Sequence, residues 1–183
     1  MGTIANILIV IMEIIAFRIS FKRIRWEMFI YYTELSNLIT LISSIAYLLS
    51  GGNVPALRYL SAVELTMTFL ITLCVLIPMG GDFKTLMLSE NGLYHHTLVP
   101  VLSFISYVFW EKHSTLWFLP VILTVIYGLT MMFLNVIGKI DGPYPFLRVR
   151  HQSRTASVVW FFALIGIISI LSFTVIFLAG CIS

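Results

Sequence analysis

The sequence predicts an all-α membrane protein in which six transmembrane helices form a single domain over residues 1–183. Only 10% of the residues are charged and 60% are hydrophobic, whereas soluble proteins have about 25% charged residues. The mean hydropathy is +1.02. Apolar runs of about twenty residues, long enough to cross a hydrocarbon core of about 30 Å, recur along the chain. The expected spans are 3–20, 27–50, 57–80, 92–110, 115–138 and 157–180.

The first apolar segment is expected to remain in the protein as a helix. Its basic residues follow the apolar run, which is the reverse of a secretory signal peptide. Asn6 stands where a myristoylation motif needs a hydroxyl residue. The longest connection runs from Lys139 to Ala156, so the sequence leaves no room for a separate soluble domain.

The distribution of lysine and arginine predicts a multi-pass protein of the cell membrane with both termini outside. Basic residues favour the cytoplasmic side. The connections after the first, third and fifth spans hold Arg18, Lys22, Arg23, Arg25, Lys84, Lys139, Arg148, Arg150 and Arg154, against Arg58 and Lys112 on the other side. A basic rim facing anionic membrane lipids accounts for the net charge of +3. No nucleic-acid partner is expected, and the oligomeric state stays open.

The polar residues of the first two spans indicate which helix faces look into the bundle, because an unpaired polar group in lipid is costly. Asn6 and Glu13 share one face of the first span, with Glu13 expected to pair with Arg18 or with a neighbouring helix. Glu34 lies about 100° round from Thr33 and is expected to turn aside. The stripe of the second span consists of Thr33, Ser36, Asn37, Thr40, Ser44 and Tyr47.

The later spans carry fewer polar groups. Glu64 in the third span is a carboxylate inside a helix, interpreted as a hydrogen-bonding or supporting group. Asn135 ends a stripe on the fifth span. The loop from Lys139 to Leu147 is apolar and rich in Pro and Gly, so it either lies in the interface or folds back over the bundle mouth. The last span is almost entirely apolar and is expected at the lipid-facing edge.

Two adjacent histidines, His95 and His96, precede Pro100 in the fourth span. Proline cannot donate to the carbonyl of residue 96, so the helix is expected to bend there. The stripe through Pro100, Ser103 and Tyr107 favours His96 as the inward ring. Adjacent histidines point about 100° apart, unlike metal-ligand pairs at i,i+3 or i,i+4. No metal and no cofactor are expected, and Cys74 and Cys181 are interpreted as packing residues.

Thr33 and His96 each fall about five residues inside their predicted spans, roughly 8 Å below the cytoplasmic interface. A threonine hydroxyl becomes a nucleophile when a base such as a neutral imidazole takes its proton. The shared depth therefore permits a Thr–His dyad where the ester bond of an amphipathic lipid would lie. Candidate groups to orient the histidine are Glu13, Asn37 and Asn135, and Tyr144 is a candidate oxyanion donor.

Three motifs extend this hypothesis: Tyr32-Thr33-x-x-Ser36-Asn37-Leu38, His95-His96-Thr97-x-x-Pro100 and Tyr144-Pro145-Phe146-Leu147. In this order they resemble the bacterial probable six-transmembrane-region proteins and, more distantly, the androgen-induced and androgen-dependent TFPI-regulating family of animals. The resemblance implies an intramembrane hydrolase acting on fatty acid esters of hydroxy fatty acids or similar lipid esters. It implies Thr33 as nucleophile, with His96 matching the bacterial pattern and His95 the animal one.

Two other interpretations remain. The polar stripes could line a cavity that binds or transports a small solute or lipid, in which case Glu64 would lie on the path. They could equally hold helices together in a protein without chemistry.

Overall fold

The computed structural model describes residues 1–182, and all regular secondary structure within that range is helical. Short 3₁₀ and π-helical turns interrupt or extend several helices. The α-helices are α1 Gly2–Ile24, α2 Tyr32–Leu49, α3 Pro55–Ile71, α4 Glu90–Gly92, α5 Val99–Trp110, α6 Phe118–Val136 and α7 Arg154–Ile182.

Within residues 1–182, four segments are long and apolar enough to cross a membrane: Gly2–Ile30, Pro55–Leu76, Phe118–Val136 and Arg154–Ile182. The chain is therefore a membrane protein by length and composition. The second and fourth expected spans differ from uninterrupted α-helices. Residues 25–30 form a 3₁₀ turn before α2, and residues 93–98 form a π-helical turn before α5. Pro100 accounts for the second irregularity, since it has no N–H to donate to the carbonyl of residue 96.

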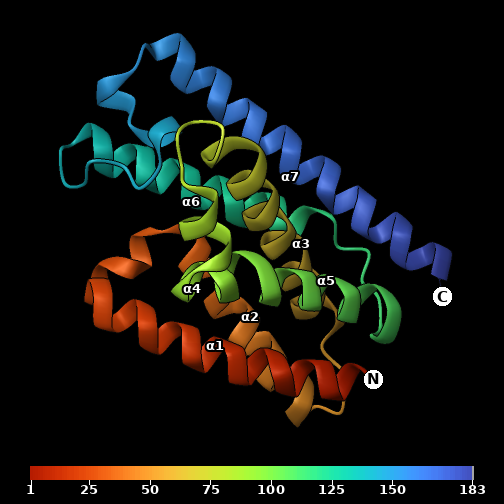
Figure 1. Cartoon of the computed structure of the whole chain (residues 1–183). Coiled ribbons are helices and arrows are strands. Elements are labelled where there is room, and N and C mark those ends of the chain that lie inside the picture. Colours follow the sequence, from red (N-terminus) through yellow and green to blue (C-terminus); the bar gives the residue numbers. More distant parts are fainter. Residues whose placement is uncertain (183) are drawn as a thin grey trace.

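α1, α2, α3 and α5 form a bundle in which α1 packs on α2 and α5, and both of these pack on α3. α7 packs on α6, α3 and α5 and runs along one side of the molecule (Figure 1). The N- and C-terminal ends of the chain lie at the same end of the molecule (Figure 1).

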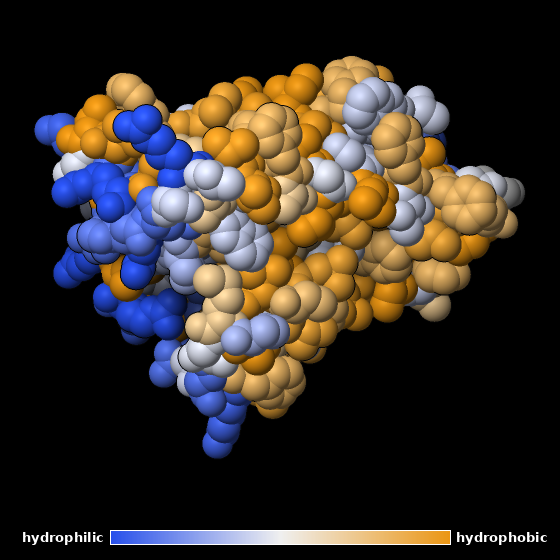
Figure 2. Space-filling model, turned by 90° about the horizontal axis from the view of Figure 1, so that it is seen from above, coloured by the Kyte–Doolittle hydropathy of each residue, from blue (hydrophilic) through white to orange (hydrophobic). Residues whose placement is uncertain are grey.

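The surface separates into a hydrophilic end and a hydrophobic body (Figure 2). Arg18, Arg23, Lys139 and Arg150 are exposed where α1 and α6 end and α7 begins. The outer face of α7 is apolar and exposed, with Phe162, Ile170 and Phe177 more than 60% accessible. Cys74 and Cys181 are also exposed, so their interpretation as packing residues of the bundle is wrong.

At the end opposite the basic residues, Arg58 and Glu111 form an ion pair inside the bundle. Arg58 is 0% exposed, and its Nε and Nη2 donate to the two carboxylate oxygens of Glu111 at 2.8 and 3.1 Å. Hydroxyls and one amide complete the cluster: Ser43, Ser44, Ser61, Ser103, Ser106 and Asn6. Arg58 is thus an internal anchor that joins four helices, although its position in the sequence suggests a loop cation.

Replacing Glu111 by Gln is expected to destabilise the fold strongly, because it leaves the Arg58 charge buried without a counter-charge. Removing one partner of a buried ion pair costs about 3–5 kcal/mol. Thermal unfolding of the purified protein in detergent measures the effect. Lys112→Gln is the matched control, since Lys112 is exposed and only reaches Asn53 at 3.4 Å. Equal unfolding temperatures for the two variants would contradict the anchoring role.

Candidate functional site

A buried acid–imidazole–acid contact lies near the basic end of the bundle. His95 Nε2 is 3.0 Å from Glu13 Oε2, and His95 Nδ1 is 3.2 Å from Glu34 Oε2. Glu13 and His95 are 0% exposed and Glu34 is 4% exposed. Glu13 therefore pairs with a neighbouring helix, which is one of its two expected pairings. This contact joins α1, α2 and the π-helical turn before α5.

Glu34 is not turned aside, and the expectation that it would be is wrong. Its Oε1 accepts from Ser20 Oγ at 2.6 Å and from Asn91 Nδ2 at 3.0 Å. Asn91 also approaches His95 Nδ1 at 3.1 Å. Ser20 and Asn91 were not singled out from the sequence. The sequence signal for this contact is that a carboxylate, Glu34, and an amide, Asn91, both lie near the starts of expected spans.

His96 occupies a different environment from His95. Its Nδ1 lies 2.6 Å from Thr72 Oγ1, and its ring lines the polar cavity described below. Thr72 begins a π-helical turn, Thr72–Leu76, that continues α3, and His96 lies in the π-helical turn Leu93–Leu98. Both histidine rings thus face the interior. The expectation that His96 is the inward ring is met, but the expectation that His95 is not is wrong.

Thr33 lies in the first turn of α2 and contacts Tyr144. Tyr144 Oη is 3.3 Å from Thr33 Oγ1 and accepts from the Thr33 backbone N–H at 3.2 Å. Tyr144, Phe146 and Leu147 are all buried, so the loop between α6 and α7 folds back over the bundle. Burial raises the pKa of Tyr144 to about 12. Its hydroxyl therefore stays protonated at neutral pH and is available as a hydrogen-bond donor.

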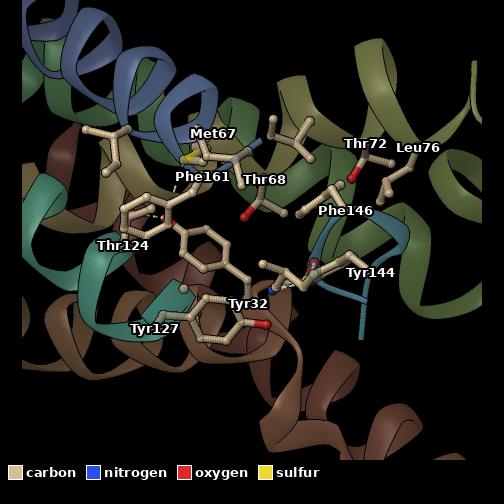
Figure 3. A pocket seen from close by; sticks show the side chains of 16 residues that line it. Tyr32, Met67, Thr68, Thr72, Leu76, Thr124, Tyr127, Tyr144, Phe146 and Phe161 are labelled. Atoms are coloured by element: carbon tan, nitrogen blue, oxygen red, sulfur yellow. Dashed lines mark hydrogen bonds between the residues drawn. The ribbon is translucent and has the colours of Figure 1, made fainter. Parts of the chain in front are cut away.

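Thr33 and Tyr144 lie where two cavities meet. The larger cavity has a volume of about 580 Å³ and is called the polar cavity because Arg23, Glu34, Asn91 and His96 are among its lining residues; aliphatic side chains and prolines supply much of the rest of its lining. The apolar pocket is narrow, about 50 Å³, and is lined largely by aromatic and aliphatic side chains with the hydroxyls of Thr68, Thr72 and Thr124 (Figure 3). Thr33, Tyr144 and Leu76 line both.

Ser36 and Asn37 hold the first turn of α2 below Thr33. Both donate to the Thr33 carbonyl, at 3.0 and 2.7 Å, and Asn37 also reaches the His95 carbonyl at 3.4 Å. Neither contacts a histidine ring nitrogen, so Asn37 does not orient a histidine through its ring.

The remaining candidates have other partners. Glu64 bonds to the hydroxyls of Tyr32 and Thr124. Asn135 donates to the Ile140 carbonyl at 3.1 Å and accepts from the Arg150 N–H at 3.1 Å. Asn135 thus fixes the loop that carries Tyr144. The structure assigns it to loop support, and no contact joins it to either histidine.

Within residues 1–182, no group of three His, Cys, Asp or Glu side chains is arranged to hold a metal ion. A scan of protein-family models and searches of curated proteins and solved structures find no match to the chain. A functional interpretation therefore depends on the geometry above and on the three short motifs.

Substitution of the two adjacent histidines is expected to have unequal effects on stability. His95→Ala leaves Glu13 and Glu34 buried without their shared partner, which costs about 3–5 kcal/mol. His96→Ala removes one hydrogen bond beside a cavity, which costs about 1 kcal/mol. Thermal unfolding in detergent compares the two. A His96 variant that is as unstable as the His95 variant would contradict this division.

Proposed function

We propose that the protein is an intramembrane hydrolase of lipid esters, with Thr33 as nucleophile and His96 as general base. The observation that carries the proposal is the position of Thr33 at the junction of a polar cavity and an apolar pocket. An amphipathic ester whose acyl chain is attached directly to a polar part has the same division. Fatty acid esters of hydroxy fatty acids or similar lipid esters are the substrates that the family resemblance suggests.

In the proposed reaction, Thr33 Oγ1 attacks the ester carbonyl carbon while His96 accepts the hydroxyl proton. The tetrahedral intermediate collapses, the bond to the alcohol oxygen breaks, and His96 returns the proton to that oxygen. A water molecule, deprotonated by His96, then cleaves the acyl-threonine ester. The products are a carboxylic acid and an alcohol, and Thr33 and His96 regain their starting forms.

The surroundings support these roles. Thr33 and His96 line the same polar cavity and form no hydrogen bond with each other, so substrate or water would bring them into contact, as is common for catalytic pairs before substrate binds. Tyr144 Oη, next to Thr33 Oγ1, is the proposed donor to the developing oxyanion. His95 is unsuited to the role of base, because both of its ring nitrogens already face carboxylates.

The surroundings of Glu64 do not favour transport. A solute path along the polar stripes was expected to pass Glu64, but Glu64 is 1% exposed and its carboxylate is bonded to two hydroxyls. Glu64 lines neither cavity.

Covalent labelling tests the proposal. A long-chain alkyl fluorophosphonate, which mimics an ester, is expected to modify Thr33, as located by mass spectrometry of the purified protein. Thr33→Ala should abolish labelling, and His96→Ala should slow it by roughly 10²–10⁴-fold, the usual contribution of a general base.

Thr130→Ala is the matched control, because Thr130 is an exposed threonine of α6 whose hydroxyl bonds to its own helix at the Ile126 carbonyl. It should label at the wild-type rate. Normal labelling of Thr33→Ala would refute the nucleophile assignment, and an adduct on Thr72 would transfer that role to the residue that His96 contacts.

We also propose that six helices cross the membrane and that both termini lie outside. The support is that α2 and the helical segment 90–110, which ends in α5, extend between the two ends of the bundle. Gly2 lies against Tyr47 near the end of α2 and against the Trp110 carbonyl at the end of α5. Near the opposite end, Glu34 in the first turn of α2 meets Ser20 of α1. Asn91, at the start of the helical segment 90–110 that ends in α5, also meets Ser20. α2 and this segment therefore both extend along most of α1.

Cysteine accessibility distinguishes six spans from four. In a protein with Cys74→Ser and Cys181→Ser, a membrane-impermeant maleimide applied to intact cells should label Asn53→Cys and should not label Asp82→Cys. Opening the membrane should make the second position reactive. If α2 and α5 do not cross, the two positions exchange their behaviour, because the connection after α2 then stays on the inner side.

A further inference from the structure

Five threonines of the apolar helices bond back to their own helix, whereas Thr72, like Thr33 and Thr124, bonds to another segment of the chain. The hydroxyls of Thr40, Thr66, Thr68, Thr130 and Thr174 donate to the carbonyl four residues earlier in their own helices. This is the usual way in which threonine satisfies its hydroxyl in an apolar helix. Thr72 makes no such bond, and within residues 1–182 its hydroxyl contacts only His96 Nδ1, at 2.6 Å.

The backbone around this contact is irregular on both sides. α3 ends at Ile71, and Thr72 is the first residue of a π-helical turn. Opposite it, His96 lies within the second π-helical turn, Leu93–Leu98. Such turns interrupt the regular α-helix, are rare, and occur frequently at functional sites. Here two of them meet across a single hydroxyl–imidazole contact.

The contact leaves the other ring nitrogen of His96 available. Nε2 forms no hydrogen bond within residues 1–182, and it is not among the buried polar atoms that lack a partner. Nε2 therefore keeps some accessible surface, and His96 is one of the residues that line the polar cavity together with Thr33. In a neutral imidazole only one nitrogen carries the proton, and the bond at one nitrogen sets the state of the other.

We infer that Thr72 is a positioning residue for His96. Its hydroxyl oxygen accepts a hydrogen bond from the protonated Nδ1 of His96. The Nε2 atom then keeps its lone pair and acts as the base toward the cavity. The inference rests on the proposed hydrolase function for its catalytic meaning. The opposite arrangement, with Thr72 donating to Nδ1, would place a proton on Nε2 and make His96 unable to accept one from Thr33.

Thr72→Val and Thr72→Ser separate the hydroxyl from the shape of the side chain. Valine keeps the shape and removes the hydroxyl, whereas serine keeps the hydroxyl and removes a methyl group. The first measurement is the ¹⁵N NMR spectrum of the histidine rings in the purified protein, with His96 assigned from the signal lost in His96→Gln. The wild type and Thr72→Ser should carry the proton on Nδ1, and Thr72→Val should lose this preference.

The second measurement is the rate of fluorophosphonate labelling as a function of pH. Thr72→Val should lower the rate at neutral pH by about tenfold or more, part of the roughly 10²–10⁴-fold contributed by a positioned base, and should shift the pH midpoint of the reaction. Thr72→Ser should retain most of the rate. Thr66→Val is the control, since Thr66 is on the same helix, bonds to the Ala62 carbonyl and lines neither cavity.

A wild-type spectrum with the proton on Nε2 overturns the inference. The inference is also overturned if Thr72→Val behaves as wild type and Thr72→Ser is impaired, because the shape of the side chain would then matter and its hydroxyl would not. The spectrum is recorded without substrate, so it is independent of the proposed function. If the tautomer depends on the Thr72 hydroxyl and the wild type does not label, the positioning contact is supported and the hydrolase proposal fails.

Discussion

The arrangement of the candidate site depends on the contact of His95 with Glu13 and Glu34. Carboxylates inside an apolar bundle need partners, since their burial is costly when they stay unpaired. One imidazole meets both of them, at 3.0 and 3.2 Å, and so joins α1, α2 and the turn before α5. The residues next in sequence to two members of this contact are Thr33 and His96. Both line the polar cavity. The contact of His95 with the two carboxylates therefore also positions Thr33 and His96, the proposed nucleophile and base.

The second ion pair anchors the opposite end of the same helices. Arg58 and Glu111 satisfy each other through two hydrogen bonds, and surrounding serines take up the remaining guanidinium donors. A bundle fixed at both ends can tolerate irregular backbone between them. The π-helical turns at 72–76 and 93–98 lie nearer the basic end, where they widen the helices around the cavity.

The sequence was sufficient to predict the helical class and the burial of most of the polar stripe of α2. It was not sufficient to place Glu34 or the histidine pair, because the prediction assumed one inward face for each helix. α2 is buried on more than one side, with Thr33 facing Tyr144 and Glu34 facing His95. The π-helical turn around His95 and His96 also departs from the 100° spacing on which the periodicity argument depends.

The loop between α6 and α7 contributes to the lining of both the polar cavity and the apolar pocket. Tyr144 and Phe146 stack at 5.3 Å between ring centroids, and Phe146 and Leu147 line the apolar pocket, whereas Pro143 and Pro145 line the polar cavity. A Pro-rich segment suits this position because it needs few backbone hydrogen bonds, and Asn135 holds its end through the Arg150 N–H. The loop thus lines both cavities, and Tyr144 brings its hydroxyl to the Thr33 hydroxyl. For the proposed hydrolase, this arrangement fits an ester whose polar and apolar parts meet at the bond that is cleaved, because Thr33 lines both cavities.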